Sequence, residues 1–173
     1  SDTSAPAGQT EESQIGDRTV RVISDSLLAQ HHRAANRLVI CESVATVSEE
    51  TIQRVADRSI SLEALTEALP DEIQTLVIVD GGTGYCHAVS SITSTRPCYW
   101  TWHEGTLLIS SSLRQLAQAG VSLSFDEDSL PELCCYRVLI PPRTVARGIS
   151  RIRFGEAVSV DCHTGAVLKR HLW

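Results

Sequence analysis

The sequence predicts an α+β fold with a largely antiparallel sheet, and three features support this prediction. Several short segments alternate apolar and polar residues or are apolar throughout, as β-strands are. Some of these segments are joined by compact glycine-containing turns, which is the pattern of β-hairpins. Other segments have apolar residues at helical spacing and lie between the strands. Strands and helices are therefore expected to be mixed along the chain.

The expected strands are of two kinds. Residues 19–24 (TVRVIS) alternate with a period of two, like a half-buried strand, whereas residues 75–80 (TLVIVD) form an apolar run. The other candidates are residues 37–42, 85–92, 98–103, 106–110, 157–161 and 166–171.

Three short turns are expected between neighbouring strands. Glu104-Gly105 and residues 162–165 each separate two strand candidates. Residues 81–84 (GGTG) have a phosphate-binding loop as an alternative interpretation. They lack the Gly-Lys-Ser/Thr ending of such a loop and lead into a strand, so a hairpin turn is preferred.

Helices are expected in five places, each with a local signal. Asp25 can cap a helix over residues 25–35, whose exposed face would hold His31 and His32. Ser111 or Ser112 can cap a helix that directs Leu113 and Leu116 inward and ends at Gly120. The remaining helices are expected over residues 48–55, 61–69 and 126–136.

The composition suits one domain and excludes some classes of protein. The chain has 173 residues, of which residues 1–17 are expected to form a disordered polar tail and residues 18–173 the domain. The net charge of −6 argues against a nucleic-acid-binding protein. No apolar run approaches the length of a membrane span and no signal peptide is apparent, so a cytoplasmic protein is expected.

The cysteines are expected to be reduced and to pack as small apolar residues. The chain has six cysteines and no CxxC pair, which makes a zinc site a weak interpretation. Two Cys-His pairs occur, at Cys86-His87 and Cys162-His163. Neighbours in a strand point to opposite faces, so these pairs are not expected to hold one metal ion.

The segment from about Leu76 to Trp173 resembles a known family. Its hairpin with STRPCYW at residues 94–100 and the serines that follow are similar to a segment of class II glutamine amidotransferases of the asparagine-synthetase branch. The same resemblance extends to four later segments: Pro142-Arg143-Thr144, Arg147-Gly148-Ile149, Arg151-Ile152 with Gly155-Glu156, and Arg170-His171-Leu172-Trp173. It implies a four-layer αββα sandwich of the N-terminal-nucleophile type with mostly antiparallel sheets.

The resemblance also implies that the chemistry of the family has been lost. The family uses an N-terminal cysteine as nucleophile, with its own α-amine as base, and an Asn-Gly pair as oxyanion hole. Here residue one is Ser1, at the end of the polar tail, and Cys41-Glu42-Ser43-Val44 falls near the position of the Asn-Gly segment. A carboxylate at Glu42 would repel a developing oxyanion. No counterpart is found of the family's His-Arg-Gly run or its Ser-Asp-Thr-Glu run.

These departures predict a catalytically silent glutaminase-like domain, with no catalytic residue, metal or cofactor of its own. It resembles the divergent N-terminal domains of beta-lactam synthetases and lasso-peptide cyclases. The expected partner is an asparagine-synthetase-like adenylating domain or subunit, which would hold ATP and Mg²⁺ and form an amide bond in natural-product biosynthesis. The synthetase's Ser-Gly-Gly-x-Asp-Ser loop is absent here. Leu172 and Trp173 are the expected anchors of the interface with this partner.

Two other functions stay open from the sequence. The first is an active amidotransferase or amidohydrolase with Ser1 as nucleophile, for which Ser24 and Cys41 are further candidates. The second is a free-standing module that binds a small ligand in the former glutamine pocket.

Overall fold

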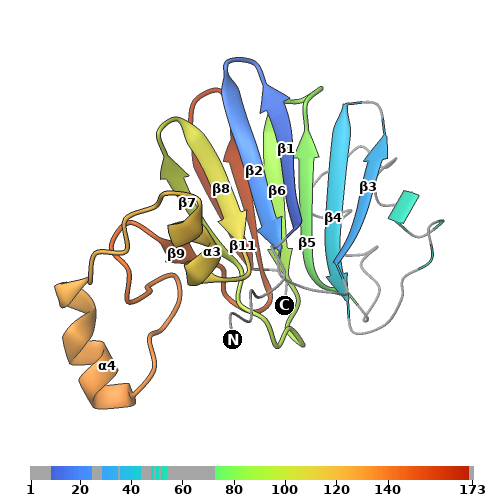
Figure 1. Ribbon diagram of the computed structural model, residues 1–173. Coiled ribbons are helices and arrows are strands. Elements are labelled where there is room, and N and C mark those ends of the chain that lie inside the picture. The colour runs from blue at the N-terminus through green and yellow to red at the C-terminus, as the bar shows by residue number, and fades with distance from the viewer. Residues whose placement is uncertain are drawn as a thin grey trace, which may run out of the picture.

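Two β-sheets lie face to face in this computed structural model and make up most of the molecule (Figure 1). The structure describes residues 9–24, 29–34, 36–43, 48, 50, 52–53 and 73–171. In this part of the chain the fold is α+β and both sheets are mostly antiparallel, which confirms the coarse fold class predicted from the sequence.

The first sheet has five strands in the order β1-β2-β8-β7-β9. Their bounds are Gln9–Ile15 for β1, Arg18–Ser24 for β2, Tyr99–His103 for β7, Thr106–Ser110 for β8 and Ser150–Arg151 for β9. Three of the pairings are antiparallel, while β2 and β8 run parallel. The ends of β2 and β8 therefore lie at the same edge of the sandwich.

The second sheet has six strands in the order β11-β10-β6-β5-β4-β3, and every pairing is antiparallel. Their bounds are Ala29–Ala34 for β3, Arg37–Ser43 for β4, Ile73–Asp80 for β5, Tyr85–Ser90 for β6, Glu156–Asp161 for β10 and Val167–His171 for β11. Strand β5 is buried along its whole length, as expected for an apolar strand in the middle of a covered sheet.

The main hydrophobic core lies between the two sheets. The first sheet contributes buried side chains from three strands, and the second from four: Ile15, Val20, Val22, Leu107 and Ile109 face Leu38, Ile40, Val77, Val79, Cys86, Ala88, Val158 and Val160. A second cluster covers the outer side of the second sheet and includes Ile52. A third covers the outer side of the first sheet, where Leu116 packs with Leu108 and Ile149. Apolar layers thus lie between the sheets and on both outer faces.

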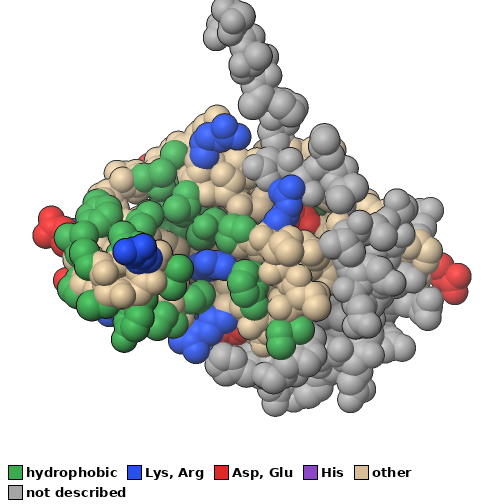
Figure 2. Space-filling model, turned by 90° about the horizontal axis from the view of Figure 1, so that it is seen from below, with side chains coloured by type: hydrophobic (Ala, Val, Ile, Leu, Met, Phe, Trp, Pro, Cys, Tyr) green, Lys and Arg blue, Asp and Glu red, His purple; other side chains and the backbone are tan. Residues whose placement is uncertain are grey.

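Three of the described helical segments fall between residues 113 and 136. Helix α3 (Leu113–Gln118) lies against the first sheet, whereas η1 (Glu127–Ser129) and α4 (Leu130–Tyr136) protrude from the sandwich (Figure 1). Seen from below, hydrophobic side chains gather around α4 with Lys or Arg side chains among them (Figure 2). None of the described helices is long and apolar enough to span a membrane.

Two expectations are wrong for the residues that the structure describes. The predicted tail over residues 1–17 includes β1, whose Ile15 is buried and whose Glu11 and Glu12 pair with Arg33 and Arg21. The helix predicted over residues 25–35 is replaced over residues 29–34 by strand β3, paired with β4. In both cases pairing with a neighbouring strand outweighs the local sequence signal.

Most of the other predicted elements are confirmed. The strands, the hairpin turns, α3 and the helical region at residues 127–136 are found within a few residues of their predicted bounds. Helix α3 ends at Gln118 and is closed by Gly120, which has a φ of 99° just after the C-cap Ala119, as expected. Ser112 at its start makes no capping hydrogen bond through its side chain. The helix predicted over residues 61–69 lies outside the described residues.

Candidate functional site

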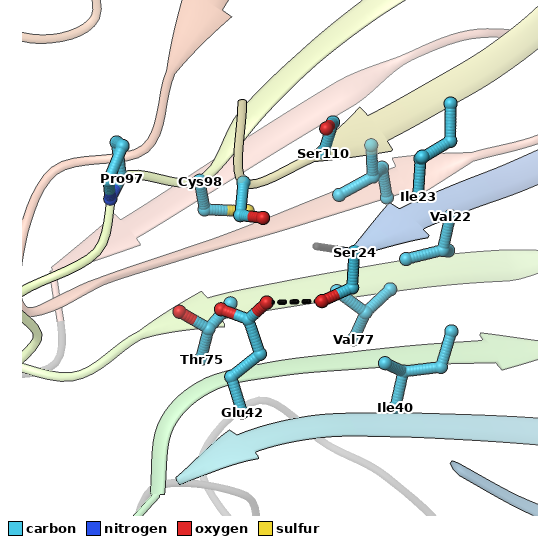
Figure 3. A pocket seen from close by; sticks show the side chains of 12 residues that line it. Val22, Ile23, Ser24, Ile40, Glu42, Thr75, Val77, Pro97, Cys98 and Ser110 are labelled. Atoms are coloured by element: carbon cyan, nitrogen blue, oxygen red, sulfur yellow. Dashed lines mark hydrogen bonds between the residues drawn. The ribbon is translucent and has the colours of Figure 1, made fainter. Parts of the chain in front are cut away.

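A small pocket opens between the two sheets, at the edge where β2, β4 and β8 end and β5 begins (Figure 3). Apolar side chains close its inner side, and the half-buried Pro97 and Ser111 lie at its outer side. The described lining residues are Val22, Ile23, Ser24, Ile40, Glu42, Thr75, Val77, Pro97, Cys98, Ile109, Ser110 and Ser111.

The polar residues of the pocket follow from the two-residue period of the strands. Every second residue of a strand faces the same way, so Ser24, Glu42 and Thr75 continue the inward-facing rows of β2, β4 and β5. The other residues of these rows are apolar and belong to the core: Val20, Val22, Leu38, Ile40, Val77 and Val79. The core therefore changes from apolar to polar at this edge.

Glu42 is the central group of the pocket. Only 5% of the residue is exposed, and its Oε1 accepts a hydrogen bond of 2.5 Å from the Ser24 hydroxyl (Figure 3). Thr75 lies directly opposite Glu42 in the β4–β5 register. Within the described part of the chain, neither Glu42 Oε2 nor Thr75 Oγ1, both buried, has a hydrogen-bond partner. The pocket thus holds a carboxylate oxygen without a donor, next to a hydroxyl that can both accept and donate.

The charge of the pocket is negative. Its described lining contains no Lys, Arg or His. Burial, together with the Glu42 carboxylate, raises the pKa of the Cys98 thiol to about 12. Cys98 is therefore protonated at neutral pH and is neither a nucleophile nor a second anion.

The pocket is small. Its cavity volume is about 20 Å³, which is room for roughly one water molecule. A group the size of a water or an ammonium fits inside, whereas a whole amino acid does not.

The described nucleophile candidates named from the sequence lie in different places in the structure. Ser24 faces the pocket, where its hydroxyl donates to Glu42. Cys41 faces the opposite side of the second sheet, in the outer hydrophobic cluster. Burial is the main reason that the pKa of the Cys41 thiol rises to about 11, so that this thiol is protonated and unreactive. Ser1, Leu172 and Trp173 lie outside the described residues.

The sequence points to Glu42 but not to the group around it. Glu42 falls near the Asn-Gly position that the resemblance implies, where its carboxylate is expected to repel an oxyanion, and the structure directs that carboxylate into the pocket. Ser24 is expected from the sequence only as a possible nucleophile, and Thr75 is not expected to belong to a site. The signal was available, since both residues fall on the inward-facing period of strands that had been predicted.

The glycine-rich stretch after β5 is a hairpin turn, as predicted. Asp80 Oδ1 accepts hydrogen bonds from the Gly82 and Thr83 amides at 2.8 and 3.3 Å, and Oδ2 accepts one from Arg37 Nε at 2.9 Å. These two amides donate to a side chain of the protein, so they stabilise the turn and are not free to bind a phosphate.

No group of three or more His, Cys, Asp or Glu side chains in the described part of the chain is placed to hold a metal ion. Cys86 points into the core between the sheets, whereas its neighbour His87 shares a 2.7 Å hydrogen bond with Ser159. All six cysteines are free, and four of them are buried.

Comparisons with known proteins do not place the chain in a family. No family model matches the sequence, and no curated protein does.

Proposed function

We propose that this chain is a catalytically silent glutaminase-like domain that supports an ATP-dependent ligase of the asparagine-synthetase type. In this proposal the two sheets are those of an N-terminal-nucleophile sandwich. The ligase partner would activate a carboxylate with ATP and Mg²⁺ and form an amide bond, as in lasso-peptide or beta-lactam biosynthesis.

The pocket supports the proposed silence. A glutaminase needs hydrogen-bond donors at the developing oxyanion, and removal of one such donor typically lowers the rate about 10²–10³-fold. Here the buried group at the end of β4 is the carboxylate of Glu42, which carries the opposite charge to the one required. The cavity of about 20 Å³ also leaves no room for glutamine.

The observation that carries the supporting role is an exposed hydrophobic surface at α4, which we call the α4 face (Figure 2). Tyr136, Val138 and Ile140 are 66%, 61% and 54% exposed. Leu123, Phe125, Leu130, Val145 and Phe154, which lie in the same stretch of the sequence or close to it, are also exposed. Exposed hydrophobic side chains that gather on one side of a protein, as those in Figure 2 do, mark sites of protein–protein contact.

A groove within the α4 face indicates the chemistry of the partner. It has a volume of about 280 Å³ and is lined by Tyr99, Leu113, Leu133, Val138, Leu139, Arg143, Thr144, Val145 and Arg151. The buried Nε of Arg151 has no hydrogen-bond partner in the part of the chain that the structure describes. Arg143 has only one acidic contact among the described residues, Glu132 at 3.6 Å. A complementary partner would present apolar side chains with an acidic group between them.

Leu172 and Trp173 remain predicted anchors of the contact with the partner. Their role rests on the resemblance at the end of the chain, and the α4 face is an independent indication of a partner.

The proposed silence is tested by incubating the purified chain with glutamine and measuring glutamate. We expect no release above that of a buffer blank. Release that disappears in Ser1→Ala or in Ser24→Ala would instead identify an active amidohydrolase and its nucleophile. Cys41→Ala serves as a matched control, because its thiol faces away from the pocket.

A further inference from the structure

We propose that the pocket at Glu42 binds a primary ammonium group, either the ammonium ion itself or the amine end of a small ligand. This inference goes beyond the proposed partner role and does not depend on it, because it rests on the pocket alone.

The charge of the buried Glu42 carboxylate favours a cation as the ligand. Burying an ionised carboxylate is costly unless an opposite charge or several hydrogen bonds compensate it. Glu42 is buried, accepts a hydrogen bond from Ser24, and has no cationic side chain beside it among the described lining residues. A bound cation supplies the compensation that the described protein groups do not.

The hydrogen-bonding groups of the pocket favour a ligand that donates hydrogen bonds. An ammonium group offers only donors, as the side chain of lysine does. Among the described residues, neither Glu42 Oε2, an acceptor, nor Thr75 Oγ1, which can accept as well as donate, has a hydrogen-bond partner, and the two residues are paired in the β4–β5 register. An anion would be repelled by Glu42. A calcium ion would require six to eight oxygen ligands, and the described lining offers one carboxylate.

The size and shape of the cavity favour a small group with at most one substituent. The cavity of about 20 Å³ accepts a group of about the volume of one water. The side chains of Val22, Ile40, Val77 and Ile109 close it on the inside, so a nitrogen that carries several methyl groups does not fit. The outer side, at Pro97 and Ser111, lets a ligand with a single substituent extend outward.

The test is thermal unfolding in salts of equal ionic strength at neutral pH. Ammonium chloride and methylammonium chloride are expected to raise the Tm saturably relative to sodium chloride, because a ligand that binds only the folded state stabilises it. Tetramethylammonium chloride is expected to match sodium chloride. The proposal is overturned if the Tm in ammonium chloride equals the Tm in sodium chloride or in tetramethylammonium chloride.

Two variants and one control assign the effect to the pocket. Glu42→Gln is expected to abolish the response. Thr75→Val, which is isosteric and removes one acceptor, is expected to weaken binding about three- to tenfold. Glu104→Gln, at the exposed turn between β7 and β8, is the control and is expected to keep the full response. An equal response in parent and Glu42→Gln places the binding elsewhere and overturns the proposal.

Longer amines separate the two possible sources of the group. If n-butylammonium binds at least as tightly as ammonium, the site accepts the amine end of a larger ligand. If ammonium binds and n-butylammonium does not, the site is one for the free ion. Either result supports the proposed chemistry.

Discussion

At the scale of single residues, two buried carboxylates differ in what surrounds them. Asp80 accepts hydrogen bonds from two turn amides and from Arg37. Burial alone would raise the pKa of Asp80, but the amides and the Arg37 guanidinium lower it below its ordinary value. Glu42 accepts a hydrogen bond from Ser24 at one oxygen, and its other oxygen has no partner among the described residues. Asp80 is therefore satisfied by the fold, whereas Glu42 is available to a ligand.

His87 provides a residue-scale prediction about pH. Burial is the main reason that the pKa of His87 lies below its ordinary value of 6.5, with Arg37 adding to the effect and Asp80 opposing it. Between the folded-state pKa and 6.5, the unfolded chain binds more protons than the folded one. Stability is therefore expected to be full above about pH 6.5 and to fall as the pH drops, by up to about 1.4 kcal/mol per pH unit.

The measurement is urea unfolding between pH 5 and pH 8. His87→Gln, which can keep a hydrogen bond to Ser159, is expected to flatten the decline on the acidic side. His163→Gln, at an exposed turn, should retain the decline of the parent. A parent and His87→Gln with parallel pH profiles would show that His87 does not cause the effect.

At the scale of elements, the β7–β8 hairpin shows how local chemistry sets a structure. Its turn residues Glu104 and Gly105 have φ angles of 49° and 77°, the pattern of a tight hairpin turn. Its strands then alternate, so that Trp100 and Trp102 pack against the core between the sheets and Tyr99 against the outer cluster. The turn therefore determines which aromatic residue reaches which layer.

Substitution of Gly105 tests this dependence on the turn. No atom lies within 4 Å of a Cβ built there, so the cost of a side chain comes from the left-handed backbone alone. Gly105→Ala is expected to lower the free energy of unfolding by about 1–2 kcal/mol. Gly105→Asn should cost less, because asparagine tolerates this conformation. Chemical denaturation measures both, and equal losses in the two variants would contradict the backbone explanation.

The elements that sequence reasoning predicted correctly are those with local signals. The hairpins at residues 75–90 and 98–110 combine apolar strands with glycine turns, and both form. Strand β1 (QTEESQI) has mostly polar residues because it lies at a sheet edge, where one apolar residue, Ile15, is buried. Strand β3 (AQHHRA) also lies at an edge and has no apolar alternation. These edge strands form because they pair with a neighbouring strand, and a single sequence does not predict which strand that will be.

At the scale of the whole molecule, the pocket depends on strands that are distant in sequence. The parallel pairing of β2 with β8 places Ile23 opposite Ser110, and the facing sheet brings Glu42 and Thr75 to the same edge. The two-residue period predicts which side chains point inward, but it does not predict which strands become neighbours. The inward direction of Ser24, Glu42 and Thr75 could therefore be predicted for each strand separately. That these three residues meet in one pocket could be found only from the three-dimensional structure.

The α4 face carries the prediction about the whole molecule and its partner. Val138→Asp and Ile140→Asp each place a charge on an exposed position, so both variants are expected to fold like the parent, with unchanged Tm. A complex with an asparagine-synthetase-like ligase should be weakened at least tenfold, or about 1.4 kcal/mol, because a buried unpaired charge would result. Titration calorimetry with the parent and each variant measures this difference.

Tyr85→Asp is the control for this experiment. Tyr85 is 41% exposed and starts β6 opposite Asp161, whereas β11 ends opposite Glu156 at the other end of β10. This variant should leave the affinity unchanged if the partner binds at the α4 face. Equal weakening by Tyr85→Asp would mean that added negative charge, and not the lost apolar contact, disturbs the complex. If the parent binds the ligase and the α4-face variants bind as tightly, the partner role stands and its surface lies elsewhere. If the parent binds no such ligase, the supporting role itself is wrong, while the ammonium site at Glu42 keeps its separate test.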